Sequence, residues 1–273
     1  MNSMKTTALA AALGVASLGL AATASAGTFT VDDSNVDLNL TNNPVGPTVI
    51  DRMTGGYNEL LTLRGDDTFD ATAYWNAGQF FLGGTEQADR LSSTGDDSDL
   101  FYGLYATFNS SGTFDEATGT FTGVTGEIEL WLDPDLDTTF DFVNMGDAAD
   151  GLDLGNTGDD ILVGSTDYLI EGEGSFDDGA LDIGSYALLF GDWVLTEDGG
   201  NYFTSPDPFF DILRISGQFD FIEGFDEEAG TYNVTGSADV RYREVPAPGV
   251  LALFGIGLLA LGLAVRRRTP LAA

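Results

Sequence analysis

The residues best suited to chemistry are three alternating aspartates, Asp133, Asp135 and Asp137. Carboxylates at every second position of a turn can direct oxygen ligands to one side, and Ca²⁺ prefers such ligands. The run is not an EF-hand, because Thr138 stands where that loop needs Gly and Asn144 where it needs a bidentate Glu. Two interpretations stay open: a Ca²⁺ site, or a strand-end loop of three solvated acids.

A second acidic segment, residues 155–163, resembles one unit of a calcium-binding β-roll, with Asn156 in place of the second Gly. A β-roll holds its ions between stacked turns, and a single unit lacks half of the ligands. Gly and Asp are also frequent turn residues. We therefore interpret the segment as a turn that precedes a strand at 161–163, and not as a metal site.

The composition excludes most other chemistry. The chain has no Cys and no His, which removes thiolate nucleophiles, Cys or His zinc sites and Ser-His-Asp triads. Its ten basic and 44 acidic side chains disfavour nucleic acid as a partner, because phosphate binding depends on Lys and Arg. Glycan hydrolysis by two carboxylates is an alternative, but the sequence selects no pair. We expect no catalytic residues and no enzyme activity, and Ca²⁺ is the one cofactor that the residues suggest.

Strand aromatics offer a further alternative, a carbohydrate-binding module whose rings stack on sugars. Aromatic residues in strands more often belong to the core. A module of this kind would keep its glycan affinity in a chelator, whereas a Ca²⁺-dependent protein would lose it. The residues concerned are Tyr74, Trp75, Trp131, Trp193, Tyr202 and Phe203.

The elements that must position these side chains are predicted to be strands. Between residues 126 and 132, Ile and Leu alternate with Glu, as in a half-buried strand. Turn clusters such as 65–67 and 110–112 separate such segments. This spacing predicts an all-β fold, namely an antiparallel β-sandwich, with a jelly-roll-like or barrel-like arrangement as the alternative. Further strands are expected at 57–63, 68–75, 79–82, 100–108, 185–195, 210–219 and 237–242.

A weak internal repeat agrees with this fold class. Residues 111–115 recur as 216–220, and residues 124–126 recur as 234–236. The period is too long, and the copies too few, for a solenoid. We expect two related hairpins, one in each sheet.

The N-terminus has the pattern of a secretory signal. Lys5 precedes an apolar run from Ala8 to Leu20, and small residues stand at Ala24 and Ala26. We expect signal peptidase to remove residues 1–26 and to leave Gly27 as the first residue of the mature protein.

The C-terminus carries a second targeting signal. An apolar segment, 249–265, is only slightly shorter than the ~20 residues of a usual transmembrane helix. The arginines after it should remain cytoplasmic, which places residues 27–244 outside. The flanking residues are the motif Val245, Pro246, Ala247 and Pro248 and the cluster Arg266, Arg267 and Arg268.

This order of motif, short helix and arginine cluster resembles the PEP-CTERM sorting signal of exported proteins from Gram-negative bacteria that make exopolysaccharide. Ala247 stands where the family has Glu. The resemblance implies that an exosortase cuts near the motif in the tail, 245–273. Anchoring in the inner membrane would therefore be transient.

The body also resembles the flocculation-associated PEP-CTERM proteins. That resemblance implies a role in holding cells together in flocs or in a biofilm matrix with exopolysaccharide, and it supplies no catalytic residues. It rests, in chain order, on residues 57–63, 75–80, 102–106, 132–135, 156–160, 202–206 and 216–219.

The charge of the body is compatible with this role. Residues 27–244 contain all 44 acids, six arginines and no lysine. Divalent cations relieve self-repulsion of this kind, although high negative charge also serves solubility in seawater or brine. We expect an exported, non-enzymatic protein of the cell surface or extracellular matrix. Its acidic loops would bind Ca²⁺ and bridge to exopolysaccharide or to another copy of the protein.

Overall fold

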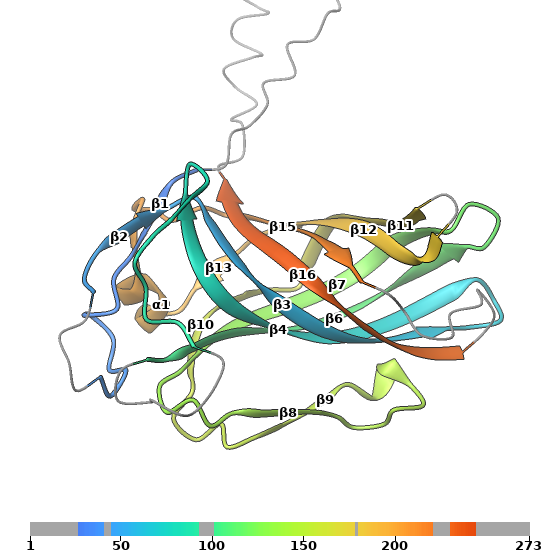
Figure 1. The fold of residues 1–273 in the computed structure, drawn as a ribbon, viewed down its shortest axis with the longest axis horizontal. Helices are drawn as coiled ribbons and strands as arrows, with labels where there is room; N and C mark the ends of the chain where they lie inside the picture. The colour runs from blue at the N-terminus through green and yellow to red at the C-terminus, as the bar shows by residue number, and fades with distance from the viewer. Residues whose placement is uncertain (1–26, 41–44, 93–100, 178–179, 221–229, 244–273) are drawn as a thin grey trace, which may run out of the picture.

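The computed structural model describes residues 27–40, 45–92, 101–177, 180–220 and 230–243. Within these residues, eight long strands form a closed antiparallel barrel, and barrel neighbours follow one another in chain order (Figure 1). The barrel strands are β3 (Arg52–Leu63), β4 (Thr68–Leu82), β6 (Gly103–Asp115), β7 (Thr120–Asp133), β11 (Tyr168–Asp177), β12 (Ala180–Gly191), β15 (Ile212–Phe219) and β16 (Gly230–Arg243).

Two ladders close the barrel. The last strand, β16, pairs with the first, β3, from Gly230 to Val240. The second ladder joins β7 to β11 between Thr120 and Thr122. Closure removes the free edges that an open sheet would present. The predicted all-β antiparallel fold is confirmed, but the described residues form one closed barrel instead of the two packed sheets of a sandwich, as in the barrel-like alternative.

Several predicted strand boundaries are wrong because pairing with both neighbours overrides local turn preference. The strands expected at 68–75 and 79–82 are one strand of 15 residues, β4. Residues 110–112, expected to form a turn, lie inside β6 and pair with β4 and β7. The strand expected at 185–195 is divided at Asp192, whose φ is 52°, into β12 and β13 (Val194–Leu195).

The internal repeat corresponds to two hairpins, one formed by β6 and β7 and the other by β15 and β16. Both hairpins belong to the same barrel, so the expectation of one in each sheet is wrong. They meet at one end of the barrel, where four phenylalanine rings pack with centroids 4.6 to 6.4 Å apart in contacting pairs. These rings belong to Phe114, Phe121, Phe176 and Phe219.

A small sheet and a short helix cover the opposite end. The sheet has the order β14 (Phe203–Ser205), β1 (Phe29–Val31) and β2 (Thr48–Ile50), and the helix is α1 (Glu197–Tyr202). Phe29, Phe203 and Tyr242 pack there edge to face, with ring centroids 5.2 to 5.7 Å apart. The middle of the barrel therefore lies between two aromatic clusters.

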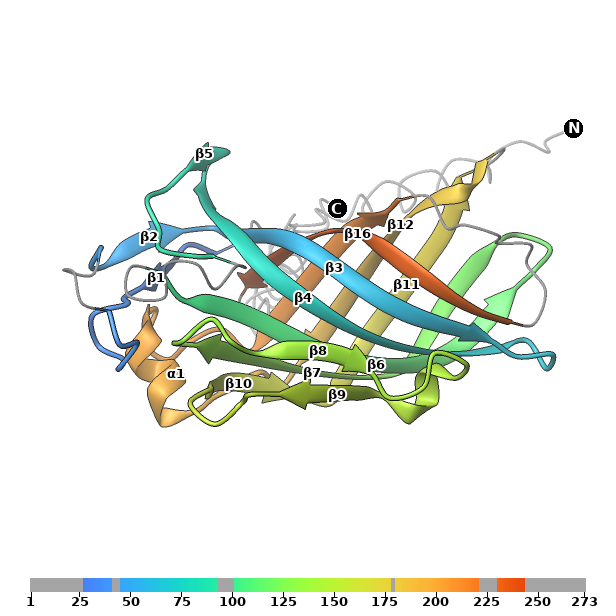
Figure 2. The ribbon, with the colours of Figure 1, turned by 60° about the horizontal axis from the view of Figure 1, so that its bottom comes forward.

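A hairpin of β8 (Thr139–Phe142) and β9 (Leu152–Gly155), with the 3₁₀ turn η2 (Ala148–Asp150), lies against the outer wall (Figure 2). Tyr74 of β4 stacks on Phe140, with ring centroids 4.5 Å apart. The Ala148 N–H donates to the Thr62 hydroxyl at 2.8 Å. This cover explains why Leu60, which points out of the barrel, is buried. The remaining short strands are β5 (Thr85–Glu86), beside β4, and β10 (Ile161–Thr166), beside β7.

The two terminal targeting signals lie outside the described residues. This applies to Ala24 and Ala26 of the signal sequence and to the whole sorting tail, residues 245–273. Gly27, the expected first mature residue, donates its N–H to the Tyr242 carbonyl at 3.0 Å. In the described part of the chain, no helix is long and apolar enough to cross a membrane.

Candidate functional site

The acidic loop after β7 is organised by its first aspartate. Asp133 ends β7 and is 6% exposed, and its carboxylate accepts the N–H groups of Asp137 at 3.3 Å and Thr138 at 3.1 Å. Leu136 adopts a left-handed conformation with φ of 55°. These contacts fold the loop back toward the end of β7 and bring Asp137 close to Asp133.

A third carboxylate comes from a different part of the chain. Oxygen atoms of Asp133, Asp137 and Asp159 all lie within 4.8 Å of one another. Asp159 stands before β10, in the segment interpreted above as a turn, and Asn156 of that segment donates to the Asp137 carbonyl at 3.0 Å. The turn before a strand is confirmed. The segment nevertheless contributes to the cluster, which the sequence interpretation missed.

Asp135 is not part of this cluster. Its side chain is exposed and accepts a hydrogen bond from the Asn39 amide at 3.1 Å. The left-handed residue Leu136 breaks the alternation that would have pointed all three aspartates of the loop to one side. Two of the three predicted ligands, Asp133 and Asp137, thus lie close together, and the third carboxylate beside them is that of Asp159 and not that of Asp135.

The electrostatics of the cluster favour a cation. Desolvation within the loop raises the pKa of Asp137, although its side chain is exposed, and the charges of Asp159, Asp133 and Asp135 raise it further. One carboxylate oxygen of Asp159 is buried without a hydrogen-bond partner among the described residues. Ion pairs between described residues hold Arg52, Arg64 and Arg241 against acids elsewhere in the protein. None of these ion pairs between described residues involves Asp133, Asp137 or Asp159.

A neighbouring acid anchors the cluster to the barrel. Asp160 accepts hydrogen bonds from the hydroxyls of Tyr105 at 2.6 Å and Thr138 at 2.9 Å. Burial raises the pKa of Asp160, and these two hydrogen bonds act in the opposite direction. Tyr105 also packs edge-on against Phe140 and parallel to Trp131. Asp160 is therefore held by a tyrosine that is itself packed between Trp131 and Phe140.

Comparison with known proteins identifies no relative of this chain. No protein-family model, no curated protein and no solved structure matches the chain. The function therefore has to be argued from the chemistry of the sites.

The aromatic residues considered for sugar stacking are not exposed. Tyr74 and Trp131 are half-buried, and both are engaged by the stacks with Phe140 and Tyr105 described above. The other four are fully buried in the core, as the commoner behaviour of strand aromatics predicts. These four are Trp75, Trp193, Tyr202 and Phe203.

Proposed function

We propose that this protein is an exported, non-enzymatic component of the cell surface or extracellular matrix that promotes cell aggregation through Ca²⁺. The observation that carries the proposal is the convergence of Asp133, Asp137 and Asp159 from two loops. An ion bound there would join the protein to anionic exopolysaccharide or to a second copy.

The coordination chemistry of Ca²⁺ supports a bridging role. Ca²⁺ takes about six to eight oxygen ligands, and three carboxylates can supply only part of that number. Asp137 is exposed, so the remaining positions would face solvent and could accept carboxylate or hydroxyl oxygens from a polysaccharide. Weak sites with dissociation constants of roughly 10⁻⁴ to 10⁻³ M suffice outside cells.

The sorting part of the proposal rests on the sequence. The signal pattern in residues 1–26 and the PEP-CTERM-like tail in 245–273 would direct residues 27–244 out of the cell. Signal peptidase and an exosortase would be the processing partners. The inner-membrane stage would be transient, and the resemblance to flocculation-associated proteins suggests aggregation as the role of the released body.

Calorimetric titration of CaCl₂ into the full chain tests the site. The parent should bind Ca²⁺, and Asp137→Asn should lower the affinity about tenfold or more, because a ligand and a charge are lost. Asp135→Asn is the matched control: it removes the same charge from the same loop, but outside the cluster. Its affinity should stay within about twofold of the parent value.

Two results would contradict the proposal. The first is a parent protein that takes up no Ca²⁺ at millimolar concentration. The second is an equal loss of affinity in both variants, which would indicate diffuse attraction to a polyanion. In cells, aggregation should be lost in a chelator, restored by Ca²⁺ and reduced by Asp137→Asn, whereas aggregation that is unchanged in the chelator would remove the ionic mechanism.

A further inference from the structure

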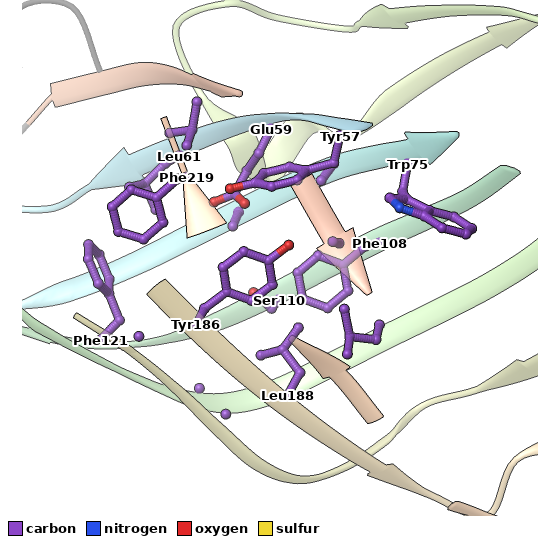
Figure 3. A pocket seen from close by; sticks show the side chains of 18 of the residues that line it. Tyr57, Glu59, Leu61, Trp75, Phe108, Ser110, Phe121, Tyr186, Leu188 and Phe219 are labelled. Atoms are coloured by element: carbon purple, nitrogen blue, oxygen red, sulfur yellow. The ribbon is translucent and has the colours of Figure 1, made fainter. Parts of the chain in front are cut away.

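The barrel interior contains a cavity of about 130 Å³ that no part of the proposed function uses. Its walls are almost entirely apolar, with Leu61, Phe108, Phe121, Leu188 and Phe219 among the side chains that surround it (Figure 3). A dry apolar cavity of roughly 150 Å³ is large enough for benzene. The barrel cavity is of comparable size, so it suits a molecule with one such ring.

One carboxyl group stands inside this apolar space. Glu59 of β3 points into the barrel, and its ladder neighbours are Val234 and Ala73. No described residue forms an ion pair or a hydrogen bond with its carboxyl group. Burial raises its pKa to about 7. A carboxylate in such a place is costly unless a partner neutralises it.

Two tyrosines direct hydroxyl groups to the same region. Tyr57 follows the same face of β3, and Tyr186 reaches across the cavity from β12 (Figure 3). Their rings meet edge to face, with centroids 5.5 Å apart. Tyr57 is only 8% exposed, and its hydroxyl interacts with the Tyr186 hydroxyl without forming a hydrogen bond of good geometry. Burial, followed by the charge of Glu59, raises the pKa of both hydroxyls, so both remain neutral.

The neighbouring strands reserve space for these tyrosines. Gly217 pairs with Tyr186, and a Cβ atom at Gly217 would lie 2.6 Å from the Tyr186 hydroxyl. Gly236 pairs with Tyr57, and a Cβ atom there would lie 2.7 Å from the Tyr57 ring. Any larger residue at either position would displace a ring. The two tyrosines of β3 and β12 are thus accommodated by glycines of β15 and β16.

We propose that the barrel interior binds a small hydrophobic amine whose ammonium group pairs with the Glu59 carboxylate. An ammonium group has three N–H donors, and Glu59 and the oxygens of Tyr57 and Tyr186 offer three acceptors for them. The apolar walls would hold the hydrocarbon part. A fatty acid or another anion is disfavoured, because Glu59 has no basic partner in the described cavity wall and the chain carries a net charge of −34.

A weak seam in the wall offers an entrance. The ladder between β7 and β11 covers only Thr120 to Thr122, and β7 next pairs on that side with β10, from Ile128 onward. Between these two ladders, Gly123 lies against Gly172, and Leu169 covers the contact. All three residues line the cavity. A stretch without ladder hydrogen bonds and with two glycines can open more readily than the rest of the barrel.

The test is calorimetric titration of the full chain with 2-phenylethylamine, using 2-phenylethanol and phenylacetate as neutral and anionic counterparts of similar size. The amine should bind most tightly, the alcohol about tenfold or more weakly, and the acid not measurably. Glu59→Gln should lower the amine affinity about tenfold or more and leave the alcohol nearly unchanged. Glu127→Gln is the control, because it removes the same charge from an exposed position.

The outcomes separate the possible ligand classes. Equal amine affinity in the parent and in Glu59→Gln would overturn the proposal, as would tighter binding of the alcohol or the acid. No binding of any probe to the parent would overturn it as well. Circular dichroism of each variant establishes folding, and removal of an unpaired buried charge by Glu59→Gln is not expected to unfold the barrel. A Ca²⁺ titration in the same samples is independent of these results.

Discussion

The ring of Tyr57 lies edge-on against the ring of Tyr186, with planes at 86° and centroids 5.5 Å apart. The two residues belong to β3 and β12, which are separated in the barrel by β15 and β16. The contact therefore crosses the interior instead of following the sheet. It joins two walls of the barrel and holds two hydroxyl groups near the single cavity carboxyl group of β3, that of Glu59.

Glu59 should make the stability of the protein depend on pH. Its pKa rises from 4.5 to about 7 on folding, so the folded state holds a proton that the unfolded chain releases. The contribution of Glu59 to the free energy of unfolding is fully present below pH 4.5 and is lost as the pH rises through about 7. Glu59→Gln should exceed the parent in unfolding free energy by about 3 kcal/mol at pH 8 and equal it near pH 4.5.

Urea unfolding of both proteins at the two pH values measures this difference. Comparing variants cancels the contribution of the other acids, and Glu127→Gln should show no such dependence because its side chain is exposed. A constant difference between Glu59→Gln and the parent across this pH range would mean that Glu59 has the same pKa in both states.

Gly236 should tolerate no side chain. A Cβ atom there would lie 2.2 Å from the Gln218 carbonyl and 2.7 Å from the Tyr57 ring. We expect Gly236→Ala to cost about 1 to 3 kcal/mol of unfolding free energy, because the ring and the backbone must both shift. Gly65→Ala is the control, since nothing lies within 4 Å of a Cβ atom at that position. Equal midpoint temperatures of thermal unfolding for the two variants would disprove the clash.

The sequence is informative about single strands and less so about their partners. The alternation in residues 126–132 correctly predicts a strand within β7, because it depends on one chain segment and one buried face. Barrel closure depends on β16 meeting β3, and no local pattern encodes that contact. Residues 57–63 do not show this alternation. Leu60 on the outer face is apolar and buried, because η2 covers that face of β3.

The candidate sites show the same limit. Asp133 and Asp137 belong to one loop, and their proximity is visible in the spacing. Asp159 joins them only because Asn156 and the loop carbonyl hold two segments together. Glu59 was one of 44 acids in the sequence. The signal that could have singled it out is its place on the same face as Tyr57 and Leu61, which are both large and apolar enough to face a core.

The stack of Phe140 on Tyr74 should link the outer hairpin to the metal site. Phe140 follows Asp137 closely, and it also packs edge-on against Tyr105, whose hydroxyl holds Asp160. Phe140→Ala should cost about 1 to 3 kcal/mol of stability, less than a fully buried ring because Phe140 is half-buried. Calorimetry should also show weaker Ca²⁺ binding. Val143→Ala, at an exposed position of the same segment, should change neither quantity, and unchanged Ca²⁺ affinity in Phe140→Ala would show that the loop holds its shape alone.

A reversible cross-link tests whether the seam between β7 and β11 is the entrance to the cavity. A Cβ atom at Gly123 would lie 3.4 Å from the Cα atom of Gly172, so we choose these two positions for cysteines whose disulfide would close the seam, and the native chain has no other thiol. Stopped-flow mixing with 2-phenylethylamine can follow binding by tryptophan fluorescence, because one of the three tryptophans, Trp75, lines the cavity. The oxidised double variant should bind about tenfold or more slowly than its reduced form, because the seam must open to admit the amine. The reduced form serves as the control for both substitutions. Equal rates in the two forms would instead place the entrance at one of the aromatic ends of the barrel.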